Sequence, residues 1–390
     1  MPRKKKEEGV LMTFIIKFGI SILNIIYCLF KLLPVKQRVV MLSRQSNHIP
    51  FEFEMLKNEL KKENPEVEVK FLCKSLGSTL DAGKVSTIIC NLSYCLHMFV
   101  QMFYLATSKV ALTDGYCITI CVLKHKKSLK VIQMWHSMGT MKLFGWTALD
   151  SEEGSNSKIA KAMHMHENYD YFFASSSAYQ KDLANGFRCP LEKARIFPLP
   201  RYDLLKDKEY QKNKKIEIYK MYPELADVKV ILYCPTFRKD ETDLGKALEK
   251  LENVVPEGSK LVIKLHPLSK LKVKTANAIC DDKFSTLEML FVADYVISDY
   301  SCIVYEAAVM GIPLCFYNFD FDLYIGKRGF AIDYMNELPG IISKDASKIM
   351  EAISKDAFDK KELKEFADKY VVPTPHATKD IVDFILEIMK

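Results

Sequence analysis

Two series of short apolar runs, separated by longer helical stretches, most limit how this chain can fold. The first series begins with RVVMLS (38–43) and the second with VKVILYCP (228–235). Strands that are apolar throughout, rather than alternating, are buried on both faces and form parallel sheets covered by helices. We therefore expect an α/β chain in which two Rossmann-like, doubly wound domains face a cleft.

The domain boundary is expected near a proline-rich stretch followed by a charged one. PLPRYDLL (198–205) and the run at 206–217 separate the two series. This predicts an N-terminal domain over 35–205 and a C-terminal domain over 206–390, whose last helix can pack back on the N-terminal domain. With 390 residues and 49% hydrophobic content, the chain is large enough for two cores.

Residues 1–34 read as a membrane-association segment. The stretch from Leu11 to Leu33 is apolar and long enough to span a bilayer. On a helix its polar residues fall within about 80°, which favours a helix lying in the membrane interface over a spanning or a buried one. These polar residues are Thr13, Lys17, Ser21, Asn24 and Lys31. Lys4, Lys5, Lys6, Lys36 and Arg38 add attraction to an anionic membrane surface.

Composition excludes some classes of protein. The 11 cysteines include no CxxC pair, which indicates reduced thiols rather than a zinc site. The net charge of +7 suits phosphates or anionic lipid, but it is too small and dispersed to indicate nucleic-acid binding.

Polar residues follow the strands of the second series, where a parallel sheet binds its ligands. Thr236 and Arg238 in CPTFRKD offer a hydroxyl and a guanidinium to a phosphate. His266 precedes Pro267, so its imidazole is expected to face the cleft. The loop with Ser298, Asp299 and Ser301 opens a helix predicted over 301–310, whose first amides favour an anion, although Ser301 could instead be only an N-cap.

Further candidates lie near this loop. Glu306 is expected to accept hydrogen bonds from ribose hydroxyls, and Arg328 to neutralise phosphate charge. Asp320 and Asp322 spell a DxD pattern that fits either a metal-nucleotide site or a simple turn, and we favour the turn.

His136 is the candidate base of the first series. It ends the strand KVIQMW and enters a loop that contains Gly139 and Lys142, both expected on the acceptor side. An imidazole titrates near neutrality and can take the proton of an attacking hydroxyl. A purely structural histidine is the alternative.

These motifs together resemble the CDP-glycerol glycerophosphotransferase family of teichoic acid synthesis. The resemblance runs through WHSMGTMKLFG, LPRYD, CPTFR, KLHP, SDYSCIVYEA and KRGFAIDY. It implies a GT-B fold, a CDP-polyol donor, a lipid-linked saccharide acceptor, and catalysis without a cofactor or a dedicated metal. The histidine pair of the family falls on His136 and His266, and its donor-site positions on Thr236, Arg238, Ser301 and Glu306.

The chain also departs from the family pattern. Cys302 follows Ser301 where many relatives carry a second serine, and PTPHATKD (373–380) replaces an acidic-glycine turn. SRQSNHIPFEF (43–53) is unusual as well, and it contributes Arg44 and Asn47 as acceptor-side candidates.

The sequence thus predicts transfer of glycerol phosphate or ribitol phosphate from a CDP-polyol to a membrane-held acceptor at the cytoplasmic face, with release of CMP. A glycosyltransferase or epimerase that uses a UDP-sugar is one alternative, and a non-catalytic membrane scaffold is another. The choice of polyol, primase against polymerase activity, and assembly as a homo-oligomer are left open.

Overall fold

The computed structural model describes the chain except residues 1, 76–83, 274, 276 and 328, and it leaves the side chains of 2–10 and 84–89 undescribed. Arg328 and the side chains of Lys4, Lys5 and Lys6 therefore lie outside the described residues. The chain divides into two compact units. Unit 1 comprises Met1–His136, Phe144–Pro200 and Thr374–Lys390, and unit 2 comprises Ser137–Leu143 and Arg201–Pro373.

Unit 1 is built on a six-stranded parallel sheet with the order β2-β1-β3-β4-β5-β6. Every residue of β1 is buried, because helices cover both faces of the sheet. The strands are β1 (Arg38–Ser43), β2 (Glu68–Cys73), β3 (Val110–Thr113), β4 (Lys130–Gln133), β5 (Tyr171–Ala174) and β6 (Ala194–Ile196).

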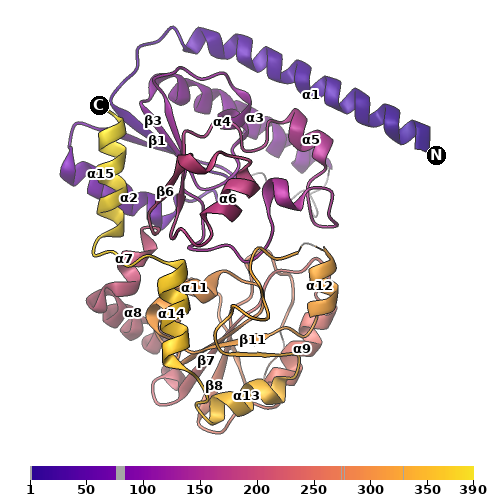
Figure 1. Cartoon of the computed structure of the whole chain (residues 1–390), viewed down its shortest axis with the longest axis vertical. Helices are drawn as coiled ribbons and strands as arrows, with labels where there is room; N and C mark the ends of the chain where they lie inside the picture. The colour runs from indigo at the N-terminus through magenta and orange to yellow at the C-terminus, as the bar shows by residue number, and fades with distance from the viewer. Residues whose placement is uncertain (1, 76–83, 274, 276, 328) are drawn as a thin grey trace. The chain divides into compact units, whose positions relative to one another are not determined.

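The helices of unit 1 come from both ends of the chain. The C-terminal helix α15 packs beside α2, and its Phe384 ring lies 5.0 Å from that of Tyr171 on β5 (Figure 1). The helices are α1 (Pro2–Phe30), α2 (Phe51–Glu63), α3 (Lys84–Thr107), α4 (Ile118–Val122), α5 (Ser157–Ala162), α6 (Gln180–Phe187) and α15 (Ala377–Ile388), with short 3-10 turns at Gly145–Ala148 and Leu191–Lys193.

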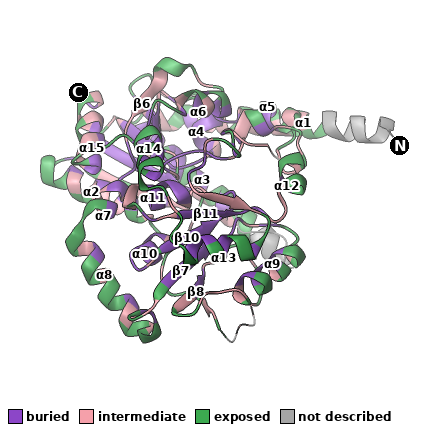
Figure 2. Cartoon of the chain, turned by 60° about the horizontal axis from the view of Figure 1, so that its bottom comes forward, coloured by how far each residue is buried: buried purple, intermediate pink, exposed green. Residues whose placement is uncertain are grey.

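Unit 2 carries a second six-stranded parallel sheet, with the order β12-β11-β10-β7-β8-β9. Its central strands β7, β10 and β11 are buried, whereas much of α8 is exposed (Figure 2). The strands are β7 (Lys229–Cys234), β8 (Ser259–Ile263), β9 (Ile279–Cys280), β10 (Tyr295–Ser298), β11 (Leu314–Tyr317) and β12 (Ile341–Ser343). The helices are α7 (Arg201–Lys206), α8 (Lys208–Met221), α9 (Thr242–Glu252), α10 (Thr286–Leu290), α11 (Ile303–Met310), α12 (Phe321–Lys327), α13 (Ala346–Ser354) and α14 (Lys360–Tyr370), with a 3-10 turn at Pro223–Leu225.

The two parallel sheets confirm the α/β class, but the helix predicted over 301–310 needs correction. The apolar spacing of 346–366 also suits a single helix, but α13 ends before Asp356, which adopts a left-handed φ of 49°. Asp359 then caps a new helix, since its side chain accepts from the amides of Lys361 and Glu362. Helix α11 begins at Ile303 with Cys302 as N-cap, so Ser301 belongs to the loop before it.

Helix α1 lies against the rest of unit 1 through residues of its polar stripe. The Asn24 amide donates to the Val122 carbonyl at 2.9 Å and accepts from the Lys124 amide at 2.8 Å. Tyr27 Oη lies 2.9 Å from His125 Nδ1, and the Lys31 ammonium donates to the Lys124 carbonyl at 2.9 Å. Asn24 and Lys31 of the polar stripe therefore contact protein, and the apolar face of the helix points outward.

Candidate active site

The strand order of unit 2 defines where a ligand is expected. Strand β7 has β8 on one side and β10 on the other, so the connections leave the β7–β10 pair in opposite directions. In doubly wound sheets, ligands bind at the carboxyl ends of such a pair. Thr236 follows β7 and Ser301 follows β10, so both lie at this edge.

Thr236 combines a fixed backbone with a hydroxyl that has no protein partner. Its amide donates to the Asp299 carboxylate at 2.9 and 3.1 Å. Its residue exposure is 7%, and its Oγ1 makes no hydrogen bond within the described part of the chain. Because a buried hydroxyl normally finds a partner, this atom indicates a place for a ligand oxygen.

Arg238 lies in a buried ionic network instead of facing a ligand freely. Its Nη2 is 2.9 Å from Asp299 and 2.9 Å from Asp320, and its Nε is 2.6 Å from Asp320. Its Nη1 donates to the Thr236 carbonyl at 2.7 Å. Burial lowers the pKa of Arg238, but the two carboxylates outweigh it and the pKa is raised. These contacts use most of the five N–H groups of a guanidinium, so the side chain chiefly shapes the loop after β7.

Ser298 and Asp299 are completely buried behind this edge. The Ser298 hydroxyl donates to the Cys234 carbonyl at 2.9 Å and so ties β10 to β7. Asp299 accepts from the Thr236 and Tyr300 amides as well as from Arg238. The contribution of both residues to a ligand site is to hold its loops.

The two aspartates of the DxD pattern have different partners. Asp320 accepts from Arg238 and, at 3.0 Å, from the Tyr300 hydroxyl. Asp322 is 2.5 Å from the Lys344 ammonium, and its side chain is 81% exposed. The pattern therefore marks the start of α12, and its carboxylates belong to separate ion pairs.

The first turn of α11 and the residues around it also lie at this edge of the sheet. Ser301 is half-buried, and its hydroxyl oxygen lies 3.5 Å from the Ile303 amide, a weak contact. Glu306, one turn later, is 2% exposed, and its Oε1 is 2.9 Å from the Arg201 guanidinium. Arg201 was not among the residues expected from the sequence, although it stands in the LPRYD motif.

His266 presents a hydrogen-bond donor at this edge. It follows β8, the other neighbour of β7, and its ring lies 5.6 Å from that of Phe237. Its Nδ1 is 3.2 Å from the Leu268 amide, so Nδ1 accepts and the proton of the neutral ring is on Nε2. Burial, and after it the charge of Lys142, lowers the pKa of His266. A neutral imidazole with an Nε2–H group is suited to donating to a phosphate oxygen.

His136 in unit 1 has the opposite tautomer. Its Nδ1 is 2.9 Å from the backbone carbonyl of Asp114, which can only accept, so Nδ1 carries the proton. The lone pair of a neutral ring is then on Nε2, as a general base requires. Trp135 immediately before it has a left-handed φ of 67°, a costly conformation for a bulky residue and one often found at functional sites.

Asp114 is a neighbour of His136 that the sequence reasoning missed. It directly follows β3, which lies beside β4 in the sheet, and its Oδ2 accepts from the Ser43 hydroxyl at 2.6 Å. Burial raises the pKa of Asp114 to about 6. The sequence feature that could have identified Asp114 is its position as a polar residue directly after the apolar run VALT. A position after an apolar run is also what identified His136.

The acceptor-side candidates occupy different places. Arg44 donates to the Tyr116 carbonyl at 3.1 Å and lies over the rings of Tyr94 and Tyr116. Asn47 accepts from the Ser75 amide at 3.0 Å. Gly139 and Lys142, in contrast, belong to the segment 137–143 of unit 2.

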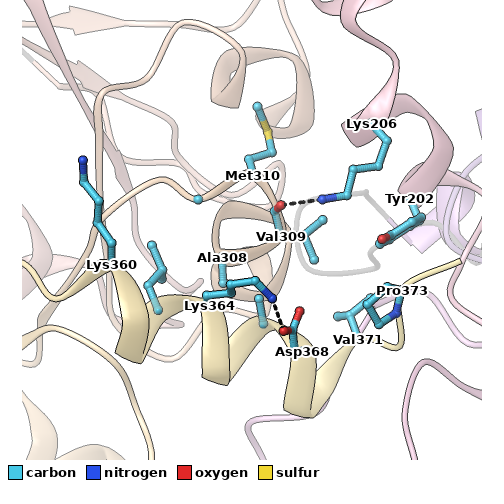
Figure 3. A pocket seen from close by; sticks show the side chains of 13 residues that line it. Tyr202, Lys206, Ala308, Val309, Met310, Lys360, Lys364, Asp368, Val371 and Pro373 are labelled. Carbon is cyan, nitrogen blue, oxygen red and sulfur yellow. Dashed lines mark hydrogen bonds and ion pairs between the residues drawn. The ribbon is translucent and has the colours of Figure 1, made fainter. Parts of the chain in front are cut away.

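A hollow of about 470 Å³ in unit 2 lies at the C-terminal end of α11, away from the Ser301 loop (Figure 3). Lys206 donates to the Val309 carbonyl at 3.0 Å there, and Lys364 pairs with Asp368. None of the residues expected to bind the donor lines this hollow, so we do not place the donor in it.

A family model decides the assignment. The model described as CDP-glycerol:poly(glycerophosphate) glycerophosphotransferase matches residues 25–387. The chain belongs to this family. The resemblance inferred from the motifs is therefore confirmed.

Similar proteins agree with this family. A teichoic acid ribitol-phosphate primase of Bacillus spizizenii is 29% identical over 375 residues, 91% of this chain and 92% of that protein. A teichoic acid glycerol-phosphate primase of Bacillus subtilis is 28% identical over 294 residues, 70% of this chain and 72% of that protein. A solved structure of the wall teichoic acid polymerase TagF has a TM-score of 0.72 at 19% identity, covering 97% of this chain and 98% of that one. This likeness confirms the GT-B fold class.

Proposed function

We propose that this glycerophosphotransferase family member transfers a polyol phosphate from a CDP-polyol to a hydroxyl of a lipid-linked saccharide and releases CMP. Its membership of the family supports the reaction class over a UDP-sugar enzyme or a scaffold. The acceptor oxygen forms a bond to the phosphorus that bears the polyol, and the bond from that phosphorus to the bridging oxygen breaks. The electron pair of the broken bond leaves with CMP.

The opposite tautomers of the two histidines carry this proposal. His136 presents the lone pair of Nε2 and takes the proton of the acceptor hydroxyl, while Asp114 keeps the ring oriented. His266 presents Nε2–H and donates to an oxygen of the diphosphate. One ring thus serves as base, and the other stabilises the charge that grows on the leaving group.

Thr236 and the start of α11 complete the proposed donor site. The Thr236 hydroxyl lacks a partner within the described residues, and the first amides of α11 favour an anion. Ser301 lies beside these amides, and Glu306 remains the candidate for the ribose hydroxyls. Arg238 acts indirectly, because it holds the loop that presents Thr236.

The acceptor is proposed to reach the enzyme at the cytoplasmic face of an anionic membrane. One helix of the described chain is long and apolar enough to cross a bilayer, over Leu11–Phe30 with a mean hydropathy of 1.9. Because hydrogen bonds tie its polar stripe to the rest of unit 1, we propose that the helix lies in the membrane interface.

The adjacent α3 exposes a second apolar stripe with Leu92, Leu96, Phe99, Val100 and Phe103. Exposed apolar side chains gathered on two neighbouring helices are typical of a membrane or protein contact surface.

Charged residues in the two apolar stripes should weaken membrane binding. Phe18 on α1 and Leu96 on α3 are 61% and 62% exposed, so Phe18→Asp with Leu96→Asp should leave the core intact. We expect at least a tenfold loss of co-sedimentation with vesicles containing phosphatidylglycerol, since each residue loses roughly 1.5–3 kcal/mol of apolar burial in the interface. The control is Ile216→Asp on α8, where the side chain is 57% exposed outside the patch. Equal binding by the double variant and the control would contradict the interfacial surface.

The reaction is tested with a panel of donors. Full-length protein is incubated with CDP-glycerol, CDP-ribitol or UDP-N-acetylglucosamine, with and without a lipid-linked saccharide. We expect CMP release with a CDP-polyol that depends on the acceptor, and a mass increase of the acceptor by whole polyol-phosphate units. UDP release, or no turnover with either CDP-polyol, would overturn the proposal.

A further inference from the structure

The segment 137–143 follows a strand of unit 1 but is packed within unit 2. Gly139 lies directly against Tyr305 of α11, where a Cβ would come within 2.3 Å of the ring, so only glycine fits. The Tyr305 hydroxyl donates to the Thr140 carbonyl at 3.1 Å. These contacts fix the first half of the segment on the helix that opens at the proposed donor site.

The second half of the segment is fixed by backbone pairing. Lys142 forms an antiparallel bridge with Phe330. On either side, the Leu143 amide donates to the Gly329 carbonyl at 3.2 Å, and the Ala331 amide donates to the Met141 carbonyl at 2.9 Å. The backbone of Lys142 is therefore held on both sides, which limits where its side chain can reach.

The Lys142 side chain extends toward residues at the carboxyl edge of the unit 2 sheet. Its ammonium is 5.8 Å from the centre of the Tyr324 ring, and that ring stacks on Tyr300, the second residue after β10, at 4.0 Å. Its charge lowers the pKa of His266, second to burial, and it opposes the burial that raises the pKa of the Cys302 thiol. The ammonium is thus within electrostatic range of His266, in the loop after β8, and of Cys302, the N-cap of α11.

Two basic side chains in the described part of unit 2, one after β7 and one after β8, are bound by carboxylates. Arg238 is bound by two carboxylates, and Lys264 is 2.7 Å from Asp281. The Arg238 network alone therefore sums to about one negative charge, which would repel a diphosphate. A positive charge from another segment would attract a ligand with several negative charges to this edge.

We propose that Lys142 is a donor-side residue that binds the diphosphate of the CDP-polyol, in place of the acceptor-side role suggested by its position after β4. This inference rests on the proposed function. Lysine binds phosphate as a point charge, so its ammonium would follow the negative charge that moves onto CMP as the bond to phosphorus breaks.

The first test measures donor affinity by calorimetry, with CDP-glycerol and CDP-ribitol as probes and CMP as the comparison. Lys142→Met should weaken binding of the accepted CDP-polyol about 10–100-fold and CMP less, because CMP lacks the second phosphate. Lys142→Arg should restore part of the affinity. The control is Lys355→Met at the C-cap of α13, an exposed lysine paired with Glu351.

The second test follows the His266 ring by NMR without any ligand. Removing a nearby positive charge makes protonation easier, so the pKa of His266 should rise in Lys142→Met and stay unchanged in Lys355→Met. This readout shows whether the ammonium lies where the structure places it, independently of turnover.

The outcomes separate this inference from the proposed function. If the wild type binds neither CDP-polyol, both the proposed function and the inference about Lys142 are wrong. If the wild type binds one and Lys142→Met binds it equally well, only the inference about Lys142 falls. A variant with unchanged donor affinity but a raised KM for the lipid-linked acceptor would show the acceptor-side role.

Discussion

The His136→Ala variant is expected to lose turnover by about 10²–10⁴-fold, the range that general base catalysis contributes. The variant removes the Nε2 lone pair that takes the acceptor proton in the proposed mechanism. Donor affinity should remain nearly unchanged, because the residues proposed to hold the CDP-polyol belong to unit 2 and His136 belongs to unit 1. Steady-state CMP release measures turnover, and calorimetry with the CDP-polyol measures donor affinity.

A second histidine of unit 1 provides the control for this experiment. His164 is 44% exposed and paired with Glu167, so His164→Ala should keep wild-type turnover. If His136→Ala kept turnover within threefold of the wild type, another group would be the base. A loss of turnover with an equal loss of donor affinity would indicate a structural role for His136.

The Arg238→Met variant is expected to destabilise unit 2 by about 3–5 kcal/mol, the usual cost of removing one partner from a buried ion pair. The reason is that Asp299 is completely buried and the Asp320 side chain is only 13% exposed, and both would lose their positive partner. Hydrogen exchange of the β7 and β10 amides measures the opening free energy of unit 2 directly. This measurement does not require the whole chain to unfold in one step.

A double variant tests whether uncompensated charge is the cause of the destabilisation in Arg238→Met. Asp320→Asn in the Arg238→Met background removes one uncompensated carboxylate and should recover part of the loss. Arg238→Lys should be intermediate, because an ammonium keeps the charge but cannot make the paired contacts to Asp320. A loss below about 1 kcal/mol in Arg238→Met would mean that water or protonation already compensates these carboxylates.

The positions of the candidate residues were predictable to a large extent. Apolar runs such as β1 and β7 are local signals, and parallel strands place all their carboxyl ends at one edge. Thr236, His266 and Ser301 therefore reach the same edge of unit 2 although they are far apart in the chain. The same rule applies to Asp114 and His136 in unit 1, where only the histidine was singled out.

Boundaries and polar faces were less predictable. The periodicity of 346–366 suits one long helix, but a left-handed residue and an N-cap divide it into α13 and α14. The polar stripe of α1 fits headgroups or water equally well, yet Asn24 and Lys31 bind backbone groups of unit 1. Periodicity identifies a face and does not say what the face contacts.

The sequence by itself determined the two parallel sheets, the edges at which polar residues gather, and the family. These depend on apolar runs and motif order, which are local properties of the chain. Only the tertiary structure decided which charges are compensated, which imidazole nitrogen carries the proton, and with which unit Lys142 packs. Each of these depends on a partner distant in sequence, such as Asp320 for Arg238 or the Asp114 carbonyl for His136. Electrostatic and hydrogen-bond energies are set by distances of a few ångströms, so they become known only when the fold brings such partners together.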